Sequence, residues 1–390
     1  MGNVPNLRFP GFEGEWKIDK VGRLCDFIVP GRNKPTIFNG DIPWITTPDI
    51  NHNQVVFTSK KGLLISKEEA KKVGSKIIPE KSIILSCVGE LGLVAIVGTE
   101  MVINQQLHAF IPKKIEYRFL LYCLGNQKKY MEKIATKTAV PYMNKDNCNS
   151  IPITFPSSQE QQKISSFLSL IDERIQTQNK IIEKLESLIK KLRQKIFNQE
   201  LRFPEFTENW IDTTLIKQTT INPKTPPLAQ KFVYIDLESV VKGELVKEVY
   251  IQSNEAPIRA ERVLEDWDIL FQCVRPYQLN NYLYRKVDSK QWVASTGYAQ
   301  LRTKNNPIFI YNLLYDKSFN LQVMTRCTGT SYPAISGGDL GKIPISICSL
   351  KEQEKIADLL SGIDEKIKVE KKLLRQYNSQ KRFVVKNLFI

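Results

Sequence analysis

The chain has 390 residues, of which 42% are hydrophobic and 25% charged, so it is long enough for two globular domains and too hydrophobic for wholesale disorder. It contains no apolar run of about 18 residues and opens without a basic start and apolar core, so we expect no membrane-spanning helix, no secretory signal and a cytoplasmic location. Fifty-six Lys and Arg residues against 41 Asp and Glu residues leave a net charge of +15. This charge either only aids solubility or indicates an anionic partner, most often nucleic acid, and we favour the partner.

The first 150 residues predict a mixed domain of short strands and helices. Strand-like segments occur at 42–45, 82–86 and 93–97, and Gly89 and Gly92 predict a turn between the last two. Ser66 opens a capping box that predicts a short helix, and a second helix fits residues 117–124. Residues 201–342 show the same mixture of short strands and helices, with strands predicted at 232–235 and 268–272 and a helix at 309–315. The predicted class is therefore α+β.

A long amphipathic helix follows each of these regions. The apolar residues of both helices alternate in steps of four and three, which is the heptad pattern of a coiled coil. Only Gln178 interrupts the first seam, while Glu370 and Lys381 interrupt the second. Such a seam can form a homodimeric coiled coil, lie on its own domain, or pair internally, and we favour an antiparallel pair of the two helices. About 40 residues would give a rod of about 60 Å.

The chain is a tandem duplication. Between residues 151–175 and 343–367, 14 of 25 positions are identical, and Leu-Arg-Phe-Pro recurs at 7–10 and 201–204, each time followed by a Trp. Thr136, Thr138 and Pro141 match Thr328, Thr330 and Pro333 in the same register. We therefore predict a first globular domain at 1–155, a central spacer helix at 156–200, a second globular domain at 201–347 and a C-terminal spacer helix at 348–390.

Sequence motifs for catalysis are nearly absent. The chain has neither a phosphate-binding GxxxxGK[ST] loop nor a GxSxG nucleophile motif. The segment at 306–309, Asn-Pro-Ile-Phe, lacks the second proline of the adenine methyltransferase tetrad and is predicted to begin a helix. Asp49, Glu69 and Lys71 could in principle form a metal-dependent nuclease site, although an exposed helix face explains the last two more simply.

Cysteine and histidine usage predicts neither a disulfide framework nor a metal centre. The seven cysteines form no CxxC pair, and an odd number without a secretory signal favours free, buried thiols. His52 and His108 are the only histidines. We therefore expect no metal site and no cofactor bound by this chain.

Several loops combine side chains suited to DNA. Arginine pairs with guanine edges and Asn or Gln with adenine edges, whereas hydroxyl and basic groups hold the phosphate backbone. The candidates of the first half are Arg32, Lys34, Lys60, Lys61, Lys137, Thr138 and Tyr142. The candidates of the second half are Arg275, Tyr277, Gln278, Asn280, Asn281, Arg326, Thr328, Thr330 and Tyr332. Solvated surface charges and polar turns remain the alternative explanation.

The duplicated openings, the Thr-x-Thr loops and the helix starts at 151–173 and 343–365 together resemble the specificity subunits of type I restriction-modification systems. The resemblance covers essentially the whole chain. It implies two target-recognition domains that each bind one half of a bipartite, asymmetric sequence in double-stranded DNA, with the helices as a ruler between them. It also implies a non-catalytic chain that recruits two methylation subunits, which use S-adenosylmethionine, and two restriction subunits, which use ATP and Mg²⁺, with no membrane partner.

Two other hypotheses remain at this point. The first is a stand-alone metal-dependent nuclease built on Asp49, Glu69 and Lys71. The second is a coiled-coil scaffold for other proteins, in which the basic charge is incidental.

Overall fold

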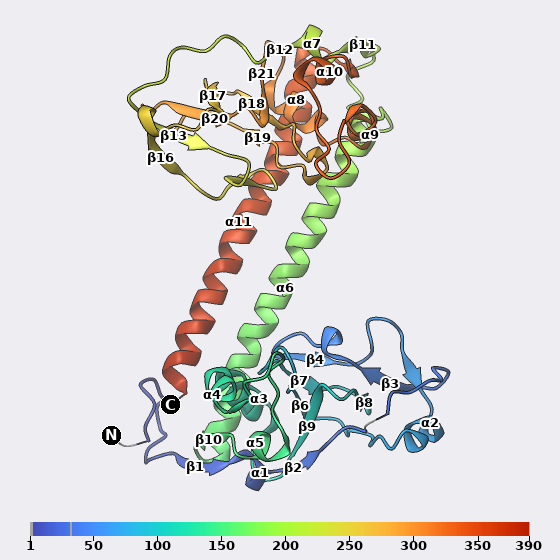
Figure 1. Cartoon of the computed structure of the whole chain (residues 1–390), viewed down its shortest axis with the longest axis vertical. Coiled ribbons are helices and arrows are strands. Elements are labelled where there is room, and N and C mark those ends of the chain that lie inside the picture. Colours follow the sequence, from blue (N-terminus) through green and yellow to red (C-terminus); the bar gives the residue numbers. More distant parts are fainter. Residues whose placement is uncertain (1–2, 32, 390) are drawn as a thin grey trace. The chain divides into compact units, whose positions relative to one another are not determined.

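The computed structural model describes residues 3–31 and 33–389. It divides into two compact units (Figure 1), which are described in turn. Unit 1 comprises residues 1–179 and 373–390, and unit 2 comprises residues 180–372.

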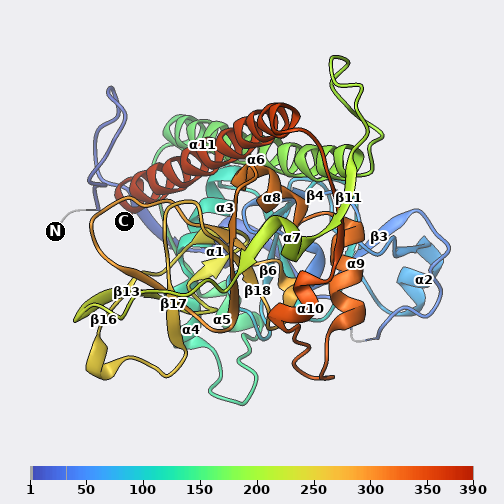
Figure 2. The ribbon, with the colours of Figure 1, turned by 90° about the horizontal axis from the view of Figure 1, so that it is seen from above.

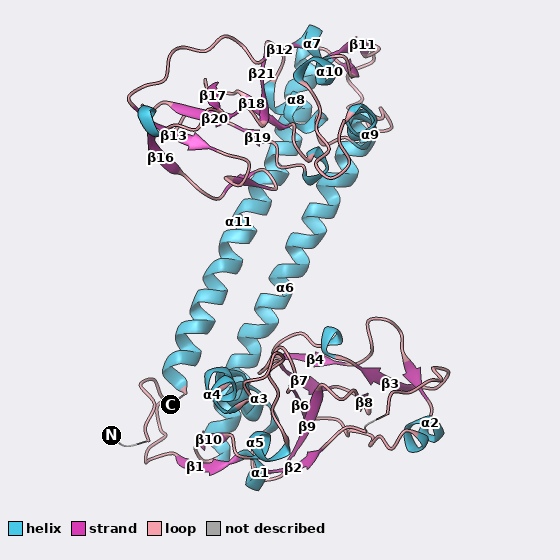
Figure 3. Ribbon diagram, viewed as in Figure 1, coloured by secondary structure: helices cyan, strands magenta, loops and turns pink. Residues whose placement is uncertain are grey.

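Unit 1 is built from short strands and helices (Figure 3), as the sequence predicted. Its elements are β1 (Lys17–Lys20), α1 (Val21–Leu24), β2 (Cys25–Ile28), β3 (Ile42–Ile45), η1 (Thr47–Asp49), β4 (Gln54–Val56), β5 (Leu64–Ile65), α2 (Lys67–Lys72), β6 (Ile83–Ser86), β7 (Val94–Val97), β8 (Val102–Ile103), β9 (Leu107–Pro112), α3 (Tyr117–Asn126), α4 (Lys128–Ile134), α5 (Lys145–Asn149), β10 (Pro152–Phe155) and the first half of α6 (Ser158–Phe197). Ser66 caps α2 by accepting a hydrogen bond from the Glu69 N–H, as the capping box predicted.

A five-stranded sheet in the order β2-β9-β6-β7-β4 separates two cores of unit 1. Because side chains alternate along a strand, Ile83 and Leu85 of β6 pack with α3 and α6, whereas Ile84 packs on the opposite face. A three-stranded sheet, β5-β3-β8, lies beyond that second core, and β1 pairs with β10. This arrangement leaves the loop after β6 and the loop after α4 free to carry polar residues.

Unit 2 repeats this plan with different details. Its elements are the second half of α6, β11 (Ile211–Thr214), α7 (Leu215–Gln218), β12 (Thr219–Ile221), β13 (Lys231–Ile235), β14 (Val240–Val241), β15 (Glu244–Leu245), β16 (Val249–Gln252), η2 (Ser253–Glu255), β17 (Ala260–Val263), β18 (Ile269–Gln272), η3 (Pro276–Gln278), β19 (Tyr282–Leu283), β20 (Trp292–Ser295), β21 (Tyr298–Thr303), α8 (Pro307–Leu313), α9 (Lys317–Arg326), α10 (Gly337–Gly341), β22 (Pro344–Ile347) and the first part of α11 (Leu350–Leu388). Two four-stranded sheets, β12-β21-β18-β19 and β16-β13-β20-β17, replace the five- and three-stranded sheets. The helix predicted at 309–315 begins at Pro307, because the Asn306 side chain accepts hydrogen bonds from the N–H groups of Ile308 and Phe309.

The duplicated motifs form the same ion pair in both units. In unit 1, Arg8 donates to both carboxylate oxygens of Glu160, at 2.8 and 2.7 Å, and the Glu160 side chain is 1% exposed. In unit 2, Arg202 makes the same bidentate contact with Glu352, at 3.0 and 2.9 Å. The repeated opening segment is therefore fastened to the first turn of the long helix that follows its domain.

Within each unit, α6 and α11 lie side by side (Figures 1 and 2). In unit 1, Ile164 and Leu168 near the start of α6 share a core with Leu388 at the end of α11. In unit 2, Ile189 and Ile196 near the end of α6 share a core with residues near the start of α11. The antiparallel internal pair is therefore confirmed. Lys381, which interrupts the predicted seam, forms an ion pair with Asp172 of α6, with 2.5 Å between Nζ and Oδ1.

Candidate nucleic-acid interface

In both units the loop after the central strand meets the loop that carries the Thr-x-Thr motif. In unit 1, the Gly89 N–H donates to the Pro141 carbonyl at 2.9 Å. In unit 2, the Arg275 N–H donates to the Pro333 carbonyl at 2.8 Å. The Met143 N–H donates to the Cys87 carbonyl just as that of Ile335 donates to Cys273. Gly89 and Arg275 therefore occupy equivalent positions in two loop pairs, an equivalence that the sequence repeat did not reveal.

The backbone at this shared position is left-handed. Gly89 has φ of 75°, which glycine adopts freely, and Arg275 has φ of 54°, which costs a residue with a side chain about 1–3 kcal/mol. The Arg275 guanidinium lies over the Tyr332 ring, 4.2 Å from its centroid, and the Tyr332 side chain is 65% exposed. Within residues 3–31 and 33–389, this guanidinium has no hydrogen-bond partner, and its Nε atom is buried. A stacked arginine fork with unused donors suits the paired acceptors of a guanine edge.

The other candidates of this loop divide into exposed and structural residues. Tyr277 is 54% exposed, and Gln278 is exposed as well. Asn280 is half-buried, and its side chain accepts a hydrogen bond from the Lys242 N–H. Asn281 is 1% exposed and accepts from the Gln272 N–H, so it holds the loop and is not available to DNA in this conformation.

The Thr-x-Thr loop of unit 2 presents a mostly exposed surface next to Arg275. Thr328, Thr330 and Tyr332 are exposed. Arg326 is half-buried at the end of α9, where it donates to the carbonyl and side chain of Gln322. Three of these four sequence candidates are thus exposed in the loop whose Tyr332 carries the stacked arginine, and Arg326 is occupied within its own helix.

The equivalent loop of unit 1 exposes Lys137, Thr138 and Tyr142, with Tyr142 at 42%. The Thr138 hydroxyl donates to the Val140 carbonyl at 2.7 Å, and its oxygen lies 3.3 Å from the Thr136 hydroxyl. The Thr-x-Thr motif therefore shapes a tight loop in both units, and its basic and aromatic neighbours face solvent.

The lysine candidates of unit 1 lie apart from that loop in sequence. Lys34 is exposed near Trp44, with its ammonium 5.9 Å from the ring centroid. Lys60 donates to the Pro48 carbonyl and to Asn51, whereas Lys61 is exposed. Arg32 lies outside the residues that the structure describes.

Comparison with known proteins identifies the architecture. The family profile described as the type I restriction modification DNA specificity domain matches residues 13–187 and again residues 214–378. The chain belongs to this family. It is a specificity subunit of a type I restriction-modification system with two target-recognition domains.

Curated relatives and a solved structure agree with this assignment. The MjaIX specificity subunit of Methanocaldococcus jannaschii is 25% identical over 95% of this chain and 88% of its own length. The MjaVIII specificity subunit of the same organism is 23% identical over 95% of this chain and 91% of its own length. The crystal structure of an S subunit from M. genitalium, 17% identical, covers 99% of both chains with a TM-score of 0.66 and has the same fold.

The specificity subunit uses the two carboxylates of the hypothetical nuclease site as hydrogen-bond acceptors within its own fold. Asp49 is 6% exposed and accepts hydrogen bonds from Thr46 and from the Lys60 N–H. These bonds lower its pKa, although burial acts in the opposite direction. Glu69 is 4% exposed and accepts from the N–H groups of Thr36 and Ile37, while Lys71 is exposed. Their hydrogen bonds explain these carboxylates without catalysis.

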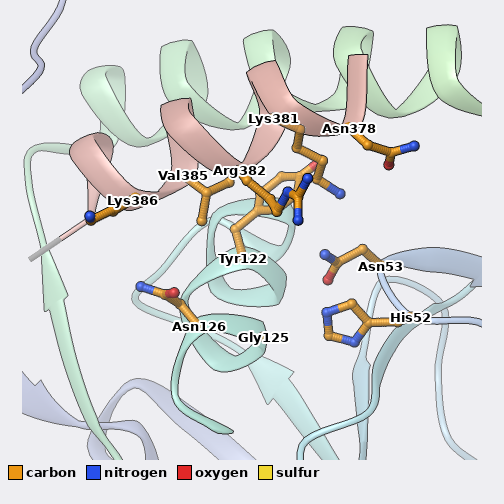
Figure 4. Close-up of a pocket in the computed structure, with 10 residues that line it drawn as sticks. All are labelled: His52, Asn53, Tyr122, Gly125, Asn126, Asn378, Lys381, Arg382, Val385 and Lys386. Carbon is orange, nitrogen blue, oxygen red and sulfur yellow. The ribbon is translucent and has the colours of Figure 1, made fainter. Parts of the chain in front are cut away.

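A basic hollow in unit 1 was missed at the sequence level. It is lined by His52, Asn53, Tyr122, Gly125, Asn126, Asn378, Lys381, Arg382, Val385 and Lys386. Figure 4 shows Arg382 and Lys381 of α11 directed toward the side of the hollow that carries His52 and Asn53. These residues come from three separate segments of the sequence, 52–53, 122–126 and 378–386, so no local pattern predicts the site.

Among the described residues, the structure contains no helix that combines the length and the hydrophobicity needed to span a membrane.

Three buried side chains of unit 1 form a second unpredicted cluster. The Cys87 and Cys148 sulfurs are 3.5 Å apart, and His108 Nδ1 is 3.3 Å from Cys148 Sγ. The hydrogen bond from Cys87 lowers the pKa of Cys148, and burial raises that of Cys87. The sequence places these residues 40 and 61 positions apart, outside any metal-binding spacing.

Proposed function

We propose that each unit of this specificity subunit recognises one half of a bipartite, asymmetric sequence in double-stranded DNA. Unit 1 contacts its half-site through the loop around Lys137, Thr138 and Tyr142, with Lys34 and Lys61 on the phosphate backbone. Unit 2 contacts its half-site through the loops around Arg275 and Tyr332. The two loop pairs have equivalent backbones and different side chains, which supports recognition of two different half-sites.

The observation that carries this proposal is the state of Arg275. Its backbone is strained in a position that glycine occupies in the other unit, and its guanidinium is stacked on an exposed tyrosine without a hydrogen-bond partner in the described chain. A strained residue persists where the surrounding structure enforces it, and such residues cluster at functional sites. We assign Arg275 to a guanine of the second half-site, with Tyr332 as the platform that orients its fork.

The catalytic steps belong to other subunits. We propose that two methylation subunits, which bind S-adenosylmethionine, and two restriction subunits, which bind ATP and Mg²⁺, assemble with this chain. The complex acts on chromosomal and foreign DNA in the cytoplasm. The chain itself supplies neither nucleophile nor general base, and its role is to bring the methylation subunits to one adenine in each half-site.

Adenine methylation mapped by long-read sequencing tests the proposal. A host that lacks restriction-modification systems of its own expresses the chain together with its neighbouring methylation subunit. We expect one new bipartite sequence motif that carries methylated adenine. Arg275→Gly, which copies the unit 1 residue at the equivalent position, should relax or abolish recognition in one half-site only. Lys290→Gly changes an exposed basic residue of unit 2 outside the paired loops and serves as the control. A stable complex that methylates no motif would refute the recognition role and favour the coiled-coil scaffold.

A further inference from the structure

At one place in the fold, here called the corner, unit 1 has a buried cluster of two cysteines and a histidine, whereas the equivalent residues of unit 2 lie in its apolar core. Cys87 follows β6, His108 lies on β9, and Cys148 lies on α5. The strand registers place His108 opposite Leu85 and Ala299 opposite Phe271, so the equivalent corner of unit 2 consists of Cys273, Ala299 and Leu340. All three of those residues are buried in the apolar core of unit 2. The fold therefore does not require His108 or Cys148 at these positions.

The three side chains of unit 1 are arranged like metal ligands. Cys87 and Cys148 are 0% exposed and His108 is 6% exposed. Their ligand atoms all lie within 4.8 Å of one another. A tetrahedral zinc ion with bonds of about 2.3 Å to sulfur and about 2.0 Å to nitrogen implies sulfur–sulfur and sulfur–nitrogen distances of about 3.8 and about 3.5 Å. The two contacts of Cys148, at 3.5 Å to Cys87 and 3.3 Å to His108, need to lengthen by only a few tenths of an ångström, and Cys87 Sγ and His108 Nδ1 lie within 4.8 Å of each other.

We propose that Cys87, His108 and Cys148 bind a structural zinc ion. Thiolate and imidazole are the ligands that Zn²⁺ prefers among protein side chains, and two thiolates neutralise its charge inside the core. His108 offers Nδ1, the ring atom that faces Cys148. The three residues supply three of the four positions of a tetrahedral site. This site departs from the sequence-based expectation that the chain binds no metal.

The burial of both sulfurs distinguishes a metal site from a redox switch. A disulfide between Cys87 and Cys148 would require an oxidant to reach sulfurs that have no exposed surface, whereas reactive cysteines are accessible. An ion that binds while the chain folds needs no such access, because the ligands close around it.

The site would fasten the base of the proposed DNA-binding loops. Cys87 is followed at once by Val88, which bridges to Tyr142, and the Cys87 carbonyl accepts a hydrogen bond from the Met143 N–H. Cys148 lies on α5, which begins just after this loop. A zinc ion would therefore tie the end of β6 and helix α5 to β9, in the unit whose loop lacks the stacked arginine.

Metal analysis of the full-length chain tests the site. We expect about one zinc per chain after purification from zinc-supplemented cells, and a fall in the melting temperature of unit 1 after treatment with a chelator. The double variant His108→Ala/Cys148→Leu copies the corner as unit 2 has it, so it should fold and hold no zinc. Cys273→Ala, at the equivalent corner of unit 2, should keep the zinc.

Cobalt substitution gives a readout that folding alone would not change. Refolding the wild-type chain with Co²⁺ should give the absorption bands of thiolate-bound tetrahedral cobalt, and the double variant should lack them. A wild-type chain that holds neither zinc nor cobalt, or that shows Cys87 and Cys148 joined as a disulfide by mass spectrometry, would overturn the proposal. Either result is independent of DNA recognition, which the methylation map measures separately.

Discussion

Removal of Arg8 should destabilise unit 1 strongly. Arg8 donates two hydrogen bonds to Glu160 and two more to the carbonyls of Glu13 and Gly14. The Arg8 and Glu160 side chains are 15% and 1% exposed. Arg8→Ala would leave the carboxylate buried without its cation, which costs about 3–5 kcal/mol.

The expected loss in the stability of unit 1 is large enough to be measured by calorimetry. In a domain of about 150–250 residues, each kcal/mol changes the melting temperature by about 2–4 °C, so unit 1 should melt about 6–20 °C lower. Urea unfolding, followed by tryptophan fluorescence, should give the same loss in the free energy of unfolding. Arg8→Met/Glu160→Met should recover much of it, because an apolar pair leaves no buried charge.

A matched surface pair supplies the control. In the same unit, an Arg23 guanidinium nitrogen lies 3.5 Å from Asp19 Oδ1, but the Arg23 side chain is 74% exposed. Arg23→Ala should therefore cost at most about 0.5 kcal/mol. The reasoning fails if Arg8→Ala and Arg23→Ala are equally stable, since burial of Glu160 would then have no energetic consequence.

Three further results are expected. Arg275→Gly should weaken binding of the assembled complex to its target by about 5–150-fold, equivalent to about 1–3 kcal/mol, without lowering stability, as competition binding and calorimetry would show. Lys381→Met should destabilise unit 1 by about 1–3 kcal/mol in urea unfolding, because it leaves the half-buried Asp172 carboxylate with the Tyr122 hydroxyl and no cation. Burial raises the pKa of Asp49, but its hydrogen bonds together outweigh burial, so its pKa is lowered in the folded state. The stability that ionised Asp49 contributes is therefore fully present above the unfolded pKa of about 3.9, and it is lost as the pH falls through the folded pKa. Asp49→Asn should therefore destabilise the chain at pH 7, and the difference from wild type in urea unfolding should shrink below about pH 4.

The architecture followed from local patterns because local physics determines it. The heptad seams predicted the pairing of α6 with α11, and the capping residue Ser66 predicted where α2 begins. The duplication also indicated that Arg8 and Arg202 have the same role, although their shared partners, Glu160 and Glu352, became visible only in the structure.

The site was predictable only in part, because its contacts join distant segments. The sequence selected Arg275 and Tyr332 separately, and it could not show that one stacks on the other. It also selected Asn281 for its chemistry, whereas the structure uses that side chain to hold the Gln272 backbone. The cysteine–histidine cluster had no signal at all, since its spacing follows from sheet topology and not from a turn.

The duplication provides an internal comparison that separates architecture from recognition. Some contacts that stabilise the fold use the same residues in both units, as in the Arg8–Glu160 and Arg202–Glu352 pairs. Others use the same backbone hydrogen bonds, as in the loops around Pro141 and Pro333. At Gly89 and Arg275 the loop backbones make equivalent hydrogen bonds while the side chains differ. Gly89 and Arg275 share a left-handed conformation that favours glycine, so the arginine persists against a local cost. Within the described chain the guanidinium contacts the face of Tyr332, and in the proposed recognition a guanine edge supplies the interaction that offsets this cost.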